Sequence, residues 1–100
     1  MSTEADIRYI QGDGPKQSAL FEQLAEECAE LGHAALKYAR CLRGENPTPV
    51  DNTEALGMVY EEYSDVVLAA RVLRLMPRED IISRKAARWA ERIAERREAK

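Results

Sequence analysis

The sequence predicts an all-α protein: a helical bundle of three long helices, with a short helix near the N-terminus. Apolar residues recur at helical spacing through long proline-free segments, and glycine and proline gather at a few interruptions. No stretch alternates apolar and polar residues as a half-buried strand would. One hundred residues indicate a single domain, with an N-terminal segment at 1–14 and a core at 15–98.

The N-terminal half contains a short predicted helix and a long one. The short helix covers 3–10 and precedes "GDGP" at 12–15, where Pro15 suits the first turn of the next helix. The long helix covers 16–43, and Gly44 is a natural cap for its C-terminus.

The C-terminal half contains two more predicted helices. A loop at 43–53, rich in Gly, Pro, Asp and Asn, leads to Asp51, which with Glu54 resembles a capping box. The helix that follows covers about 54–75. After Pro77, the segment "REDIISRKAARWAERIAERREAK" predicts the last helix, whose first acids suit a positive helix N-terminus.

Charge and hydropathy restrict the class of protein. The net charge is −3, yet residues 77–100 carry eight Lys or Arg against five Asp or Glu. The acidic remainder argues against nucleic-acid binding, and the basic end could face a small anion. The longest apolar run, "VVLAA", is too short to span a membrane, and the polar N-terminus does not resemble a signal peptide. We therefore expect a cytoplasmic protein with no membrane partner.

Two acids of the first long helix face partly inward. At about 100° per residue, Glu27 falls inside the apolar arc marked by Leu20 and Leu24, and Glu30 lies at its edge. Glu26 points away from that arc. Ionised carboxylates at the edge of a core need compensation, because their desolvation is unfavourable.

The next long helix repeats the arrangement. Glu62 and Asp65 lie three residues apart in a stripe of otherwise apolar residues. Two carboxylates from each helix could converge between the helices, and hard cations such as Mg²⁺ prefer oxygen ligands of this kind. The alternative is that each pair of acids lies on a solvent-exposed helix face and binds no metal.

The order of these acids resembles a known family. "EECAE" (Glu26, Glu27, Glu30) followed by "EEYSD" (Glu61, Glu62, Asp65) is similar to the EExxE…ExxD pattern of MazG-like, all-α nucleoside triphosphate pyrophosphohydrolases. "GPKQ", "KYARCLRG" and "DVVLAARVL" look like the flanking segments of small phage and bacterial members, so that the resemblance covers about residues 14–93. It implies hydrolysis of a nucleoside triphosphate to the monophosphate and pyrophosphate, in nucleotide-pool cleaning. It also implies a homodimer or a dimer of dimers.

The resemblance also implies roles for the acids. Glu27, Glu30, Glu62 and Asp65 would be Mg²⁺ ligands, with Mn²⁺ as a substitute. Glu26 and Glu61 are candidates for the outer shell of ligands or for the base that takes a proton from water.

The last predicted helix offers a phosphate clamp. Lys85 and Arg88 lie on one face, and "SRKAAR" looks like an Asn-Arg-Lys-x-x-Arg element of some relatives, with Ser83 in the place of Asn. The alternative is ordinary surface ion pairing, for example between Arg88 and Glu91. Trp89 is expected in the core or at a subunit interface.

Two other functional classes remain open. Glu30 and His33 form an ExxH, half of the signature of a di-iron carboxylate bundle, but the chain has a single His. A non-enzymatic helical dimerisation module would carry the same acids as solvated groups. A 100-residue chain cannot cover apolar stripes on several sides of its helices, so we expect association with a second copy.

Overall fold

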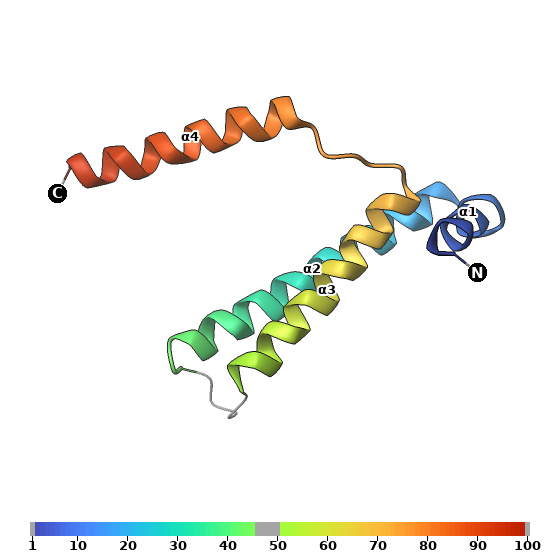
Figure 1. Ribbon diagram of the computed structural model, residues 1–100, viewed down its shortest axis with the longest axis horizontal. Coiled ribbons are helices and arrows are strands. Elements are labelled where there is room, and N and C mark those ends of the chain that lie inside the picture. The colour runs from blue at the N-terminus through green and yellow to red at the C-terminus, as the bar shows by residue number, and fades with distance from the viewer. Residues whose placement is uncertain (1, 46–50, 100) are drawn as a thin grey trace.

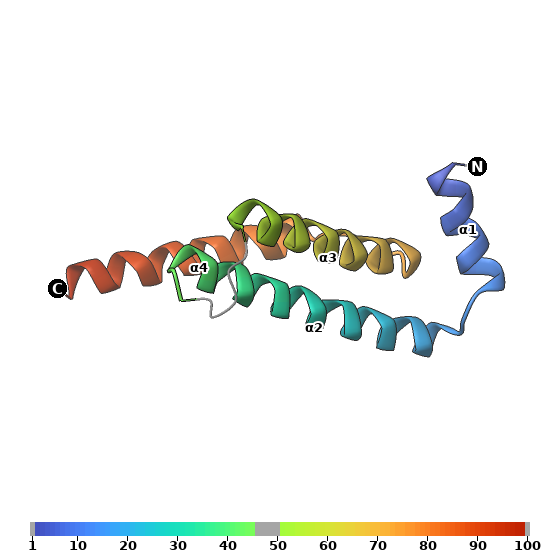
Figure 2. The same ribbon diagram turned by 90° about the horizontal axis from the view of Figure 1, so that it is seen from below.

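The computed structural model describes residues 2–45 and 51–99 and forms four helices, α1 (Thr3–Asp13), α2 (Gln17–Leu42), α3 (Asn52–Val72) and α4 (Glu79–Glu98) (Figure 1). No strand occurs in these ranges, which confirms the all-α prediction and the order of one short and three long helices. The middle of the predicted loop, 46–50, lies outside the described residues. Figure 2 shows α2 and α3 side by side as an antiparallel hairpin, with α1 at the hairpin's open end.

The two ends of the hairpin's turn follow from the local sequence. Gly44 has a φ of 70°, its N–H donates to the carbonyl of Cys41 at 3.1 Å, and the N–H of Glu45 donates to the carbonyl of Arg40 at 2.9 Å. This pattern is a Schellman motif, which glycine favours because it lacks a Cβ. At the start of α3, the side chain of Asp51 accepts from the N–H of Thr53 at 2.9 Å. Gly44 and Asp51 are thus confirmed as cap residues, although Asp51 accepts from Thr53 and not from Glu54, as the predicted capping box would require.

The predicted end of the second long helix is wrong. We expected it near Leu75, but α3 ends at Val72. Arg74 has a φ of 60°, and the N–H of Leu75 donates to the carbonyl of Ala70 at 2.9 Å, so the helix closes with a second Schellman motif. The sequence does not predict this helix end, because an arginine and not a glycine occupies the position with left-handed backbone conformation.

The N-terminal helix also differs from expectation. It continues to Asp13, and Pro15 lies before Lys16, the N-cap of α2, and therefore outside the first helical turn. The amide of Gln11 donates to the carbonyl of Val72 at 3.2 Å. That carbonyl belongs to the last turn of α3 and has no partner within the helix, so Gln11 fixes α1 to the end of the hairpin.

The core of the described chain is small. Its only buried apolar residues are Ala34, Ala55 and Val72, and no large side chain is fully buried. Within the described ranges, α4 packs against no other helix. The radius of gyration is 17.9 Å, whereas a compact chain of this length has a radius of about 13 Å. The hairpin with α1 is thus the packed part of the molecule, and α4 extends away from it (Figure 1).

Candidate metal centre

Four carboxylates from α2 and α3 meet at the hairpin interface. One oxygen atom from each of Glu27, Glu30, Glu62 and Asp65 lies within 4.8 Å of the others. The spacing of three residues places each pair about one turn apart on one face of its helix. Because the two helices pack side by side, the two faces meet, and the sequence-predicted residues form a single group that we call the acid cluster.

The acid cluster is partly buried, and two of its oxygen atoms lack a hydrogen-bond partner in the described chain. Glu27 and Glu62 are half-buried, whereas Glu30 and Asp65 are exposed. The Oε2 atoms of Glu27 and Glu62 are buried and accept no hydrogen bond from the described residues. The salt bridges of the described chain involve other residues, so neither Lys nor Arg pairs with the cluster there. Buried oxygens of this kind normally have a partner.

The clustering changes the acidity of one member. Burial raises the pKa of Glu62 above its ordinary value of 4.5, and a hydrogen bond with Glu30 and the charges of Glu30, Asp65 and Glu27 raise it further. The raised pKa of Glu62 is the response expected of a carboxyl group that lies next to three other acids.

The donor set fits a hard divalent cation. All four side chains supply carboxylate oxygens, which Mg²⁺ and Mn²⁺ accept as ligands, and two of those oxygens have no other partner in the described chain. A bound cation would place positive charge next to all four carboxylates and so offset their mutual repulsion. His33 is exposed and does not belong to the cluster, so these residues do not supply the ExxH ligands of a di-iron site.

The two candidate outer-shell acids differ in position. Glu61 lines an open hollow on α3 together with Glu62 and Asp65. Glu26 is exposed on α2 and is not among the clustered groups, in agreement with its predicted outward direction. The structure thus brings Glu61, and not Glu26, to the border of the acid cluster.

The candidate phosphate clamp lies elsewhere. Lys85 and Arg88 line a hollow on α4 with Trp89 and Arg92, and all four are exposed. Since α4 contacts neither α2 nor α3 in the described chain, the clamp and the acid cluster are not brought together within one chain. The alternative ion pair between Arg88 and Glu91 is also absent from the salt bridges of the described residues.

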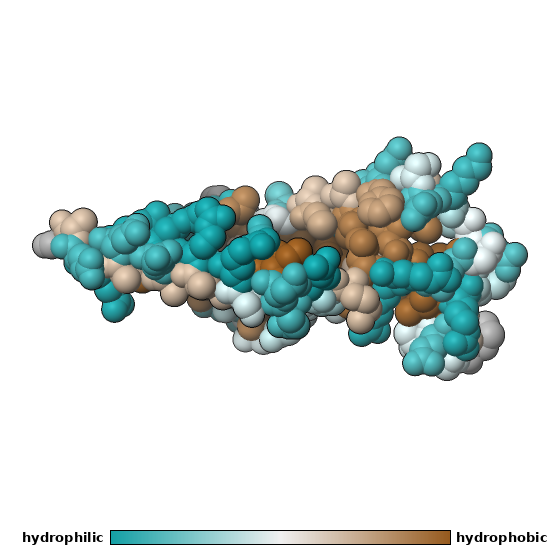
Figure 3. Space-filling model, turned by 90° about the horizontal axis from the view of Figure 1, so that it is seen from above, coloured by the Kyte–Doolittle hydropathy of each residue, from teal (hydrophilic) through white to brown (hydrophobic). Residues whose placement is uncertain are grey.

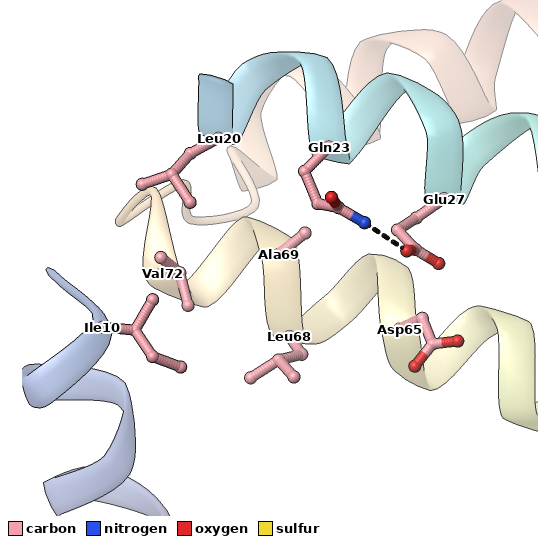
Figure 4. Close-up of a pocket in the computed structure, with 8 residues that line it drawn as sticks. All are labelled: Ile10, Leu20, Gln23, Glu27, Asp65, Leu68, Ala69 and Val72. Atoms are coloured by element: carbon pink, nitrogen blue, oxygen red, sulfur yellow. Dashed lines mark hydrogen bonds between the residues drawn. The ribbon is translucent and has the colours of Figure 1, made fainter. Parts of the chain in front are cut away.

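An apolar pocket beside the acid cluster was not predicted from the sequence. It has a volume of about 180 Å³ and is lined by Ile10 of α1, Leu20 of α2 and Leu68 of α3, among others. Glu27 and Asp65 close it on the side of the cluster (Figure 4). Gln23 also lines this pocket, and its Nε2 donates to Oε1 of Glu27 at 2.6 Å. The spacing of Gln23 and Glu27, four residues on one helix, was the available signal for this contact.

No helix in the described ranges is both long enough and apolar enough to cross a membrane. Comparison of the chain with protein-family models, with curated proteins and with solved structures finds no match. What the protein does is therefore inferred from the acid cluster and its surroundings.

Proposed function

We propose that this protein is a Mg²⁺-dependent nucleoside triphosphate pyrophosphohydrolase of the MazG-like type. The observation that carries the proposal is the acid cluster, in which four carboxylates meet without a basic partner among the described residues and leave two buried oxygens unsatisfied. The EExxE…ExxD pattern of the sequence supports the same conclusion. The reaction would be attack of water at the α-phosphorus with pyrophosphate as the leaving group, as part of nucleotide-pool cleaning in the cytoplasm.

Different residues would bind the metal, accept the proton and contact the nucleotide. Glu27, Glu30, Glu62 and Asp65 would hold Mg²⁺, which when bound neutralises phosphate charge and makes water a usable nucleophile near neutral pH. Glu61 borders the cluster and is the better placed of the two acids that could accept a proton from water. Glu26, on the outer face, would act at most through its neighbours. The apolar pocket would take the base and sugar of the nucleotide.

We further propose that the working form is at least a homodimer. Large apolar side chains are exposed on both the hairpin and α4, including Phe21, Leu36, Tyr63, Trp89 and Ile93. Figure 3 shows hydrophobic surface gathered toward the end of the molecule that carries α1, while the visible face of α4 is largely hydrophilic. A second copy would bury the exposed apolar surface, since a chain this open has too small a core to be stable alone.

The same assembly would complete the site. The clamp residues Lys85 and Arg88 lie on a helix that does not contact the acid cluster of its own chain. Residues 77–100 carry a basic excess and the rest of the chain an acidic one, so α4 of one copy complements the hairpin of another. In this arrangement the partner's α4 would bring its lysine and arginine to the phosphates.

Release of pyrophosphate from nucleoside triphosphates, measured with and without Mg²⁺, tests the enzymatic proposal. Glu62→Gln should abolish both turnover and the Mg²⁺-dependent rise in melting temperature. Glu22→Gln, an exposed position on α2 outside the cluster, is the matched control and should retain both. Turnover that survives in Glu62→Gln would remove that residue from the metal site. Wild-type protein with neither turnover nor a Mg²⁺ response would instead be a non-enzymatic dimerisation module.

A further inference from the structure

Glu27 is held by a side chain that no part of the EExxE pattern includes. The Nε2 atom of Gln23 donates to Oε1 of Glu27 at 2.6 Å, a short hydrogen bond to a carboxylate (Figure 4). The other oxygen, Oε2, is buried and has no hydrogen-bond partner in the described chain. Gln23 therefore occupies one oxygen of the carboxylate and leaves the other one available to a cation.

We propose that Gln23 is a positioning residue of the metal centre, which fixes the rotamer of Glu27 so that its free oxygen is presented to the cation. The proposal rests on the proposed Mg²⁺ site and goes beyond it, because Gln23 is not itself a ligand. Ligands of metals are commonly oriented by such hydrogen bonds, and their loss weakens metal binding by about ten- to a hundred-fold.

The geometry makes glutamine suitable for this task. Gln23 lies four residues before Glu27 on α2, so the two side chains are neighbours on one helix face without any contribution from α3. Its amide nitrogen must face the carboxylate, because the amide oxygen would repel it. As a neutral donor, Gln23 orients Glu27 without adding a positive charge that would compete with a cation.

The surroundings preserve the bond. Gln23 and Glu27 both line the apolar pocket, next to Leu20 and Leu68 (Figure 4). Aliphatic neighbours offer Oε1 of Glu27 no alternative partner, and a hydrogen bond next to apolar surface is less weakened by competing water. Gln23 itself is exposed, so the bond should contribute little to global stability and chiefly select the direction of the carboxylate.

Direct titration of the metal-free protein with Mn²⁺ or Mg²⁺ alone tests the proposal without reference to turnover. Gln23→Leu keeps the size of the side chain and removes the donor, and it should raise the Kd for the metal at least about tenfold. The melting temperature of the metal-free protein should change little. Gln17→Leu, the same substitution at another exposed position of α2, is the matched control and should leave the Kd unchanged.

A double-mutant cycle shows whether Gln23 acts through Glu27. In Glu27→Gln the carboxylate is gone, so adding Gln23→Leu should weaken metal binding no further. The proposal is overturned if Gln23→Leu leaves the Kd within about twofold of wild type, or if it weakens binding equally in both backgrounds. If wild-type protein binds neither Mn²⁺ nor Mg²⁺, both the role of Gln23 and the proposed metal site are wrong. Protein that binds metal but hydrolyses no nucleotide contradicts the proposed function alone, and the cycle still decides the role of Gln23.

Discussion

A mixture of two impaired variants should regain activity at low substrate concentration if α4 completes the site of a partner. Glu62→Gln removes one carboxylate of the acid cluster, and Arg88→Ala removes one member of the clamp. In a symmetric dimer that shares sites across the interface, each site combines the hairpin of one copy with α4 of the other. A hybrid of the two variants then contains one site with both defects and one site with none.

The size of the effect follows from this geometry. Random exchange of subunits at equal concentrations makes about half of the dimers hybrids, each with one intact site of two. At substrate concentrations well below KM, the rate should therefore reach roughly a quarter of the wild-type value. Arg88→Ala alone should retain about one to ten per cent of the wild-type kcat/KM, since a charge-assisted contact is worth about 1.5–3 kcal/mol. The two expectations are far enough apart to be resolved by a pyrophosphate-release assay.

The assay requires subunit exchange, achieved by mixing the variants under mild denaturant and diluting into buffer with Mg²⁺. Each variant treated alone is the control for recovery of active protein. Turnover of the mixture equal to the mean of the two variants would refute the shared site. The clamp would then have to act from α4 of the same chain or not at all.

Three further results are expected. Arg88→Ala should raise KM more than it lowers kcat, because phosphate contacts exist before the transition state, and Arg97→Ala, further along α4, should change neither. The raised pKa of Glu62 means that its contribution to the stability of the metal-free protein is fully present below about pH 4.5 and is lost as pH rises through the raised pKa. The melting temperature of wild type should therefore fall over that window, and that of Glu62→Gln should fall less. Arg74→Gly should stabilise the protein by about 1 kcal/mol, or roughly 4–8 °C in melting temperature, because glycine adopts the φ of 60° without strain. Gly44→Ala is the converse control: a Cβ there meets no atom within 4 Å, so any loss of stability reflects the φ of 70°.

Helix positions were largely readable from the sequence because local rules determine them. The periodicity of apolar residues located the helices, and the caps at Gly44 and Asp51 marked the turn of the hairpin. The end of α3 was not readable, since Arg74 adopts a backbone conformation that its residue type disfavours. Such a conformation is stabilised by its surroundings, here including a long 3.4 Å contact from Arg74 to Gln11 of α1.

The residues of the acid cluster could be predicted from the sequence for a similar reason, whereas the pocket and the helix around them could not. A spacing of three residues fixes the face of a helix to which two acids belong, so the sequence alone pairs Glu27 with Glu30, and Glu62 with Asp65. The apolar pocket depends on where α1 packs, which brings Ile10 beside residues that are far away in sequence. In the described part of the chain α4 packs against no other helix, so no contact there indicates its placement.

The acid cluster is the place where this chain departs most from its own local rules. Apart from Arg74, the other elements largely follow local rules: Ser2 and Asp51 cap α1 and α3 with their side chains, and most charged residues are exposed. At the hairpin interface the sequence instead places four carboxylates together, two of them half-buried, where apolar residues would pack with less repulsion. Departures of this kind are expected at functional sites, because a stabler arrangement was available to the same backbone. A cation that binds the folded chain and not the unfolded one would recover the lost stability, so metal binding and folding should be linked.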